Sequence, residues 1–309
     1  MSDLGSHRSL EATERRIALV TIFTPFLAVL ALVGAFWGRG VTWLDLILCL
    51  VMYSLTMLGI TLGYHRLFTH HSFKCVPPLT ALLGVSGCMA AQGPILFWTA
   101  CHRHHHRCSD TEGDPHSPHT FGTGLSAALR GWWHAHCGWM LNHKPENYRR
   151  LVPDLIRNPT ILRIDRYYFL WIALGLFLPG VIAASLTHTW IGFFRGVLWG
   201  GFVRIFLVHH TTWSINSICH LFGSAPFDTH DESRNNIFCA FLTFGEGWHN
   251  NHHAFPSSAR HGLSWWQFDL TYIILRALAF CGLASDIREP KPEEISMRQK
   301  TISNSTNVA

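Results

Sequence analysis

The chain has 309 residues, of which 48% are hydrophobic and only 14% charged, and its formal net charge is +5. This composition, with a mean hydropathy of +0.17, argues against an ordinary water-soluble domain and favours an integral membrane protein. No nucleic-acid-binding motif accompanies the positive charge, so acidic lipid headgroups are the expected partner of the basic loops.

Four apolar segments have close to the ~20 residues needed to cross a ~30 Å hydrocarbon core. They follow a polar N-terminal tail of residues 1–16, and the first of them lacks a clear cleavage site, so we interpret it as an anchor. The predicted fold is an all-α membrane protein with four transmembrane helices and a cytosolic, histidine-rich helical cap that holds a two-metal site. We predict the spans over residues 17–37, 41–62, 168–186 and 191–211.

A fifth apolar segment, residues 77–98, is not predicted to cross the membrane. It contains a proline pair and several glycines, and one crossing there would place the histidine clusters on either side of it on opposite membrane faces. Irregular backbone at membrane depth is tolerated only where protein buries it. We therefore predict a re-entrant or interfacial segment.

The membrane domain is predicted to end with an interfacial helix over residues 264–283, which closes a domain of residues 17–284. Gln267, Asp269 and Arg276 favour an amphipathic helix at the membrane surface over a fifth span. The polar residues 285–309 are predicted to be disordered.

The basic residues indicate the orientation, because Lys and Arg are enriched in cytoplasmic loops. All of them except Arg39, Arg195 and Arg204 fall on the side of the histidine clusters in this topology. We therefore predict that the clusters face the cytoplasm, most simply at a bacterial inner membrane.

Three histidine clusters carry the strongest functional signal, because clustered histidines are typical of metal sites. Two of them have a His-x-x-His-His pattern, which places side chains three and four residues apart on one helix face. A tetrahedral zinc ion uses four ligands, so eight histidines overfill one site and two ions fit better. Imidazole alone leaves iron, zinc, copper and nickel open. The candidate ligands are His65, His70, His102, His105, His106, His249, His252 and His253.

Asn216 and His220 extend this set, since they stand four residues apart just beyond the fourth span. Cys101 and Cys108 bracket the second cluster, but their spacing matches no common zinc pattern, and we favour reduced thiols. Six single histidines are interpreted as hydrogen-bonded or exposed residues: His7, His116, His119, His188, His230 and His261.

From about Thr61 to Leu283, the chain resembles membrane fatty-acyl desaturases of the delta-9 type, in particular the short bacterial and cyanobacterial members. The resemblance rests on the order, spacing and flanks of its motifs. These are GYHRLFTH from Gly63, CHRHHH from Cys101 with DTEGDPH from Asp110, NSICH from Asn216, GEGWHNNHHAFP from Gly245 and RHGLSWW from Arg260.

This resemblance implies that two iron ions are ligated by the eight clustered histidines and His220, with Asn216 holding one ion through water. It implies a di-iron reaction that uses O2 and two electrons to place a cis double bond, at delta-9, in a long-chain fatty-acyl substrate. The chain shows no fused cytochrome-like domain, so a separate electron donor, ferredoxin or a cytochrome, is expected. The substrate head group stays open between acyl-CoA, acyl-carrier protein and acyl-lipid.

Two alternatives remain. An acetylenase or a hydroxylase would share the histidine framework and differ in geometry near the metals. A metal transporter belongs to a different class, and it would place ionisable residues inside its spans. Residues 17–37 and 168–186 contain no charged residue or histidine, which favours the enzyme.

The resemblance also implies an acyl tunnel partly formed by the second span, with Met52, Tyr53, Met57 and Leu58 as candidate walls.

Overall fold

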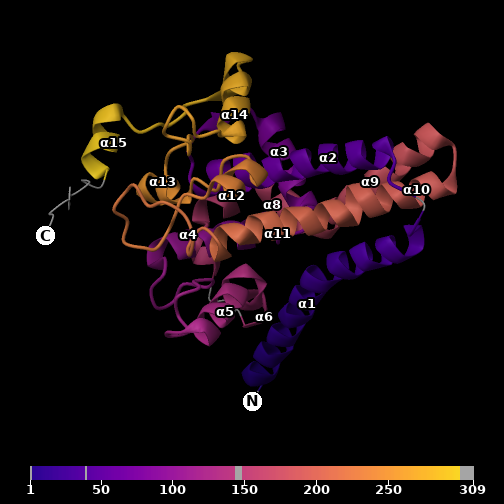
Figure 1. Ribbon diagram of the computed structural model, residues 1–309, viewed down its shortest axis with the longest axis horizontal. Helices are drawn as coiled ribbons and strands as arrows, with labels where there is room; N and C mark the ends of the chain where they lie inside the picture. The colour runs from indigo at the N-terminus through magenta and orange to yellow at the C-terminus, as the bar shows by residue number, and fades with distance from the viewer. Residues whose placement is uncertain (1, 39, 143–147, 300–309) are drawn as a thin grey trace, which may run out of the picture.

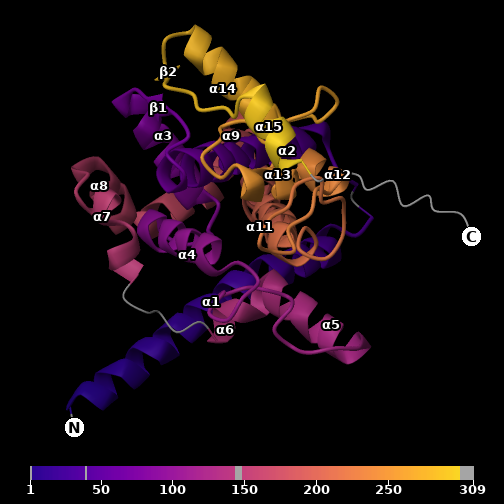
Figure 2. The same cartoon turned by 90° about the vertical axis from the view of Figure 1, so that its left-hand side faces the viewer.

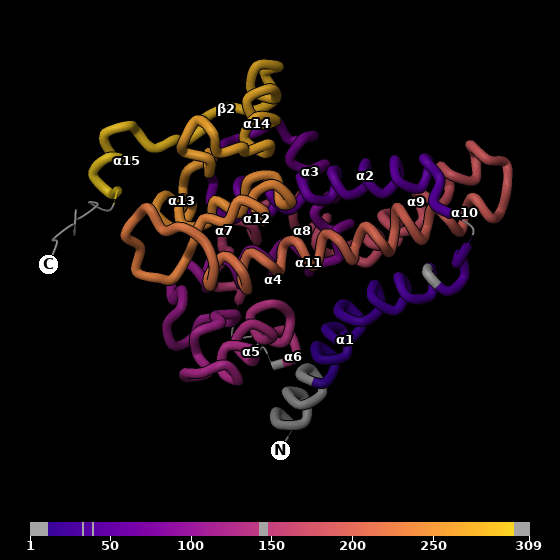
Figure 3. Tube along the Cα trace, in the orientation of Figure 1, coloured from indigo at the N-terminus to yellow at the C-terminus, as the bar shows by residue number. Residues whose placement is uncertain are grey.

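The computed structural model describes residues 2–38, 40–142 and 148–299. Figure 1 shows long helices lying side by side on the right and shorter helices and loops gathered on the left, which we call the cap. Helix α1 runs at an angle to the others, as the chain trace in Figure 3 shows. Within the described residues the only strands, β1 (Lys74–Cys75) and β2 (Ala284–Ser285), form one short antiparallel pair.

Four helical stretches are long and apolar enough to cross a membrane. They match the four predicted spans to within two residues at the non-histidine ends, and the second and fourth continue further toward the histidine clusters. Helix α1 (Ser2–Phe36) already begins inside the predicted N-terminal tail. The four stretches are Ala12–Phe36, Trp43–Thr69, Tyr168–Thr187 and Trp190–Ser217.

Spans two and four each contain a π-helical segment. In span two, α2 (Trp43–Leu58) begins with a capping box formed by Thr42 and Asp45 and continues into η1 (Gly59–Thr69). Such wide turns are frequent at functional sites, and η1 contains the first histidine cluster. Span three is α9 (Tyr168–Thr187) alone. Span four consists of α10 (Trp190–Gly196), η4 (Val197–Val203) and α11 (Arg204–Ser217).

Helix α3 (Pro77–Met89) is too short to cross a membrane, in keeping with the predicted non-crossing segment, whose depth stays a prediction. It packs tightly on η1, because a Cβ at Gly59 would lie 2.2 Å from the backbone nitrogen of Gly87. A glycine pair at this point therefore sets the distance between the two helices.

The end of α3 is held by a buried arginine of span four. Arg204, which is fully buried, donates to the carbonyl oxygens of Met89 at 2.6 Å and Gly175 at 2.7 Å. His209 donates from Nε2 to the Ala90 oxygen at 3.0 Å. The Met89 and Ala90 carbonyl groups lie at the end of α3, where helical partners are lacking, and the Gly175 carbonyl lacks its helical partner because Pro179 has no N–H. These bonds fix the turn that leads into α4 (Ile95–Cys108), the helix of the second histidine cluster.

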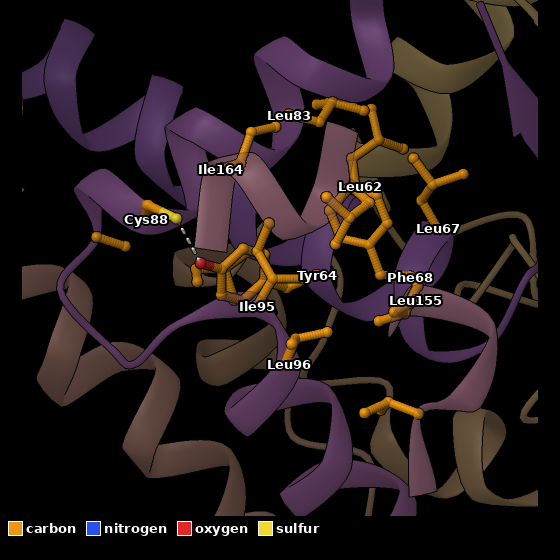
Figure 4. Close-up of a cluster of buried hydrophobic side chains, with 14 of the residues drawn as sticks. Leu62, Tyr64, Leu67, Phe68, Leu83, Cys88, Ile95, Leu96, Leu155 and Ile164 are labelled. Carbon is orange, nitrogen blue, oxygen red and sulfur yellow. Dashed lines mark hydrogen bonds between the residues drawn. The ribbon is translucent and has the colours of Figure 1, made fainter. Parts of the chain in front are cut away.

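A buried apolar cluster joins η1, α3 and α4 to one another, and Figure 4 shows its central side chains. Tyr64 has no exposed surface, and its hydroxyl lies 3.1 Å from Cys88 Sγ and 3.2 Å from the Gly93 carbonyl oxygen. Burying each large apolar side chain contributes about 1.5–3 kcal/mol, so this cluster firmly positions the first two histidine clusters.

The cap consists of short helices from two parts of the chain. Figure 2 looks onto it and places α4 and α13 near the middle of the view. Between spans two and three lie α5 (Leu125–Trp133), η2 (His134–Gly138), α6 (Trp139–Asn142), η3 (Tyr148–Leu151), α7 (Pro153–Ile156) and α8 (Pro159–Arg166). After span four lie α12 (Ile237–Leu242), α13 (His249–Ala254), α14 (Leu270–Phe280) and α15 (Pro292–Arg298).

The structure differs from the predicted interfacial helix over residues 264–283. The helix covers only Leu270–Phe280, and the two acidic or amide side chains before it are buried. Asp269 pairs with Arg66, and Gln267 accepts a hydrogen bond from Asn251 at 2.9 Å. These polar residues support the protein interior, so the reason given for an interfacial helix was wrong at both positions.

The predicted disorder of the C-terminal residues is also wrong as far as residue 299. Ser285 belongs to strand β2, and α15 lies against the end of α13. Arg298 donates to the Ala254 carbonyl oxygen, and its guanidinium lies 5.1 Å from the Phe255 ring centre. These contacts order a segment whose composition alone is typical of disorder. Residues 300–309 lie outside the described part of the chain.

Candidate metal centre

The nine predicted histidine ligands fall into two groups, and within each group the nearest ring nitrogens lie within 4.8 Å of one another. We call them the five-histidine group and the four-histidine group. The first contains His65, His70, His102, His106 and His252. The second contains His105, His220, His249 and His253.

Helices α4 and α13 contribute to both groups, which follows from the His-x-x-His-His pattern. On α4, His102 and His106 stand four residues apart on one face, while His105 projects from a neighbouring position into the other group. On α13, His252 joins the five-histidine group, and the other two cluster residues join the four-histidine group. The two helices therefore lie between the groups, and the pattern divides their ligands.

The spacing of the ring nitrogens fits bound metal ions. His252 Nε2 lies 3.1 Å from His65 Nε2 and 3.0 Å from His106 Nε2, and His220 Nε2 lies 3.0 Å from His249 Nε2. Nitrogens bound at ~2.0–2.1 Å to one ion are separated by roughly 3.0–3.4 Å. In addition, the buried Nε2 atoms of His70, His105 and His253 have no hydrogen-bond partner. A metal ion in each group would give these atoms a partner.

Four carboxylates whose side chains are at most 10% exposed lie behind the rings and orient them. An ionised carboxylate only accepts hydrogen bonds, so the histidine Nδ1 facing it must carry the proton and leave Nε2 free to bind a metal. Hydrogen bonds of this kind join Nδ1 of His105 to Asp114 at 3.0 Å, of His220 to Asp110 at 2.7 Å and of His253 to Asp231 at 2.5 Å, and His65 Nδ1 lies 2.6 Å from Glu246 Oε2.

Burial keeps most of these imidazoles neutral. It lowers the pKa of His102 and His249 well below the usual value, and it lowers the pKa of His253 to about 4 despite the bond to Asp231. His220 is the exception: burial opposes its charged form, but the hydrogen bond to Asp110 outweighs burial and raises the pKa of His220. Neutral rings suit metal binding, since a ligating histidine must be unprotonated.

Glu246 is held against His65 by a buried ion-pair network. Arg66 is fully buried and donates to Glu246 Oε1 from Nε at 3.1 Å and from Nη2 at 3.0 Å. It also donates to both carboxylate oxygens of Asp269, at 2.9 Å and 3.2 Å. The other oxygen of Glu246 lies 3.2 Å from His261 Nδ1. This network connects the five-histidine group to the loop that precedes α14.

Two histidines that we interpreted as ordinary hydrogen-bonded or exposed residues lie beside the metal groups. His261 groups with His65 and Glu246, and His116 groups with His105 and Asp114. Both side chains are buried. Their motifs were recognised, but a lone histidine carries no spacing signal. The four carboxylates were likewise not predicted to act on the site, and Asp231 stands in no recognised motif at all.

An apolar cavity reaches the metal groups from the side of the spans. His65, His102, Asn216 and His249 line it. Its other walls include Ile60, Phe97, Trp98, Trp139, Thr212 and Trp213. Among the described residues, the lining does not include the candidate tunnel walls Met52, Tyr53, Met57 and Leu58.

The cysteines beside the second cluster do not join the metal groups found among the described residues. Cys101 lines the apolar cavity, where burial raises the pKa of its thiol to about 12. Burial also raises the pKa of Cys108, to about 11. Both thiols therefore stay protonated near neutral pH, which disfavours thiolate ligation.

Comparison with known proteins agrees with this geometry. The model of the family described as "Fatty acid desaturase" matches residues 41–283. The chain belongs to the fatty acid desaturase family. Desaturases of this family are oxygen-dependent oxidoreductases, and the four apolar helices make this desaturase a membrane protein.

Curated relatives cover most of the chain. It is 43% identical over 277 residues to a hex-5-enoyl-[acyl-carrier protein] acetylenase of Moorena producens (strain JHB), covering 89% of this chain and 86% of that protein. It is 40% identical over 258 residues to an sn-1 stearoyl-lipid 9-desaturase of Anabaena variabilis, covering 82% and 88%. An acyl-CoA C20 Delta5-desaturase of Anemone leveillei is 37% identical over 268 residues, covering 85% and 79%.

Proposed function

We propose that this desaturase introduces a cis double bond, at the delta-9 position, into a long-chain fatty-acyl substrate. The observation that carries the proposal is the apolar cavity that ends at both histidine groups. An acyl chain in that cavity would present an unactivated methylene pair to the metals. The delta-9 assignment is further supported by the relative from Anabaena variabilis, whose name specifies a stearoyl-lipid 9-desaturase.

We propose two iron ions as the metals, one in each histidine group, with Asn216 acting on the four-histidine ion through water. The donor set fits, because imidazole is a good ligand for iron and the neutral rings offer unshared Nε2 lone pairs. Iron would supply the oxygen activation that side chains cannot perform themselves. The proposed ligands are therefore the nine grouped histidines.

The chain's own residues supply orientation and exclusion of water. Asp110, Asp114 and Asp231 hold the rings of the four-histidine group, and the pair of Glu246 and Arg66 holds His65. The aromatic walls Phe97 and Trp98 are positioned to pack on an acyl chain next to the metals. A dry, shaped cavity limits which methylene pair comes within reach.

The histidine groups are proposed to face the cytoplasm of a bacterial inner membrane. There a separate donor, ferredoxin or a cytochrome, would deliver two electrons. A second, more polar cavity on the far side of the site is lined by His106, Arg107, His253 and Arg298. It gives the metal ligands an approach that the acyl cavity does not occupy.

An acetylenase is the second candidate, and a specific observation favours it. The relative from Moorena producens is named for acetylenic-bond formation on an acyl-carrier-protein substrate, and it is 43% identical. Other relatives are named for acyl-lipid or acyl-CoA substrates, so all three head groups are candidates here. Membership of the desaturase family argues against the metal-transporter alternative.

The test is lipid analysis in a host that lacks its own desaturase. Gas chromatography and mass spectrometry with double-bond derivatisation would compare the parent chain with the His105→Ala variant. A new delta-9 monounsaturated acid seen only with the parent supports the proposal, whereas an acetylenic or hydroxylated product selects a sister reaction. No new product from metal-loaded enzyme supplied with a donor and with lipid, CoA and carrier-protein substrates would refute it.

A further inference from the structure

Helix α12 (Ile237–Leu242) exposes all four of its large side chains, and all of them are apolar. Ile237 is 56% exposed, Phe238 79%, Phe241 69% and Leu242 48%, while only its two small residues are buried. The helix contains no charged residue. Water-facing surfaces seldom gather large apolar side chains in this way, so such a face usually contacts a partner or a membrane.

The apolar surface continues onto two neighbouring segments. Phe268 is 46% exposed, and its ring centre lies 6.5 Å from that of Phe241. Phe222, which is 62% exposed, is tied to the start of α12 because Asn236 donates to its carbonyl oxygen at 3.3 Å. We define the α12 patch as Phe222, Ile237, Phe238, Phe241, Leu242 and Phe268.

The patch is continuous with the surface of the membrane spans. Tyr53 of span two donates to the Leu242 carbonyl oxygen at 2.7 Å, and the same hydroxyl lies 3.1 Å from Thr211 Oγ1 of span four. Figure 3 shows α12 beside α11. Helix α12 also contacts span four directly, because Cys239 Sγ lies 3.6 Å from Ser214 Oγ. It is therefore attached to two helices that are long and apolar enough to cross the membrane.

The position of Tyr53 along its span indicates the depth. Span two begins at Trp43, which is 81% exposed, and tryptophans at helix ends are typical of the membrane boundary. Tyr53 comes ten residues later, which is about 15 Å along the helix and near the middle of a ~30 Å core. About half of the hydrocarbon core lies between Tyr53 and the membrane boundary on the histidine side. The Tyr53 side chain and its hydrogen bond to Leu242 together are shorter than that distance. Leu242 therefore lies inside the hydrocarbon boundary.

We propose that the α12 patch is immersed in the lipid leaflet on the histidine side of the membrane. The partner is the acyl region of the bilayer, since the patch is uncharged and adjoins lipid-facing helices. Thr243, the residue after α12, lines the acyl cavity. The same short segment would then have lipid on one side and the substrate cavity on the other. This contact is independent of which bond the enzyme desaturates.

The test measures lipid exposure directly by electron paramagnetic resonance. A nitroxide label is placed on Phe238→Cys in lipid nanodiscs, after the three cysteines that are not buried, Cys75, Cys108 and Cys281, are replaced by serine. The probes are O2, which concentrates in lipid, and a water-soluble nickel chelate. The matched control is Met297→Cys on α15, which is 77% exposed and lies away from the patch.

The O2-to-nickel accessibility ratio is expected to be at least about fivefold higher at position 238 than at position 297, as for an interfacial helix immersed in lipid. Equal ratios would overturn the proposal. Low accessibility to both probes at position 238 would also overturn it, because protein and not lipid would then cover the patch. The metal content of each labelled variant confirms folding, and Phe241→Cys replaces Phe238→Cys if that variant is lost.

Discussion

The five-histidine and four-histidine groups draw ligands from the same two helices, α4 and α13, yet they are held in different ways. In the four-histidine group, three of the four rings donate from Nδ1 to an aspartate. In the five-histidine group, His65 contacts Glu246, and that carboxylate is shared with Arg66. The four-histidine group thus has fewer imidazoles, and more carboxylate charge lies behind its rings.

This difference indicates that the two proposed metals would not be held equivalently. A carboxylate behind a histidine orients the ring and raises its basicity, so it strengthens each bond to the metal. The five-histidine group has an additional ring, but the charge of Glu246 is partly balanced by Arg66 at 3.0 Å. Substitutions behind the rings should therefore weaken one metal at a time, which can be measured.

The largest effect is expected from removing a ligand of the four-histidine group. His105→Ala should lower turnover by more than about 100-fold, because changes merely behind a ligand already cost ~10–100-fold. Metal analysis should show that one of two ions is lost. His104→Ala is the matched control, since His104 bonds to the Gly113 carbonyl oxygen at 3.0 Å and lies outside both groups. Full activity of His105→Ala would remove this residue from the ligand set.

Glu246→Gln should lower both the metal affinity of the five-histidine group and the stability of the fold. The change leaves the fully buried Arg66 with Asp269 as its remaining carboxylate, and breaking a buried ion pair costs about 3–5 kcal/mol. The measurement is thermal unfolding in detergent with parallel metal analysis. Glu289→Gln is the control, because its carboxylate partners Tyr272 and Arg276 near the surface. An unchanged unfolding temperature would contradict the proposed support.

Asp231→Asn should have a smaller effect that is confined to the four-histidine group. Asparagine offers His253 Nδ1 a neutral acceptor, and loss of the charge should lower metal affinity by about 10–100-fold. Competition with a chelator should then show one ion leaving early and one leaving as in the parent. Asp228→Asn tests the same loop at an exposed carboxylate. Early release of both ions would mean that the two groups are not independent.

Three-and-four spacing predicted that the clustered histidines of α4 and α13 would point in the same general direction, because it fixes the face of a helix. It could not predict the division into two groups, which depends on how α4 and α13 are placed by contacts far apart in the sequence. Asp269 was interpreted as a polar residue at the membrane surface. Its partner Arg66 lies 203 residues earlier, and a local sequence pattern cannot predict such a pair.

The C-terminal segment shows the same limit. Its prolines and mixed charges are typical of disorder, yet α15 is held at Phe255, where Ile295 packs and Arg298 stacks. Composition describes what a segment prefers alone, whereas these contacts depend on an apolar surface supplied by the end of α13. Span positions were better predicted, because length and hydropathy are properties of the segment itself.

The smallest predicted effect concerns Asn216. Its substitution tests whether this residue completes the ligand set of the four-histidine group. Asn216 precedes His220 by four residues and faces the acyl cavity beside His249. If it acts on the metal through water, Asn216→Ala should keep both ions and lower turnover by roughly 10-fold, the lower end for an indirect partner. Asn216→Asp should restore part of the activity, since it keeps an oxygen at the same position. Turnover and metal content are measured together, because the two readouts distinguish an indirect partner of the metal from a direct ligand. Loss of an ion in Asn216→Ala would make Asn216 a direct ligand and the two groups equal in ligand number, whereas full turnover would remove it from the site.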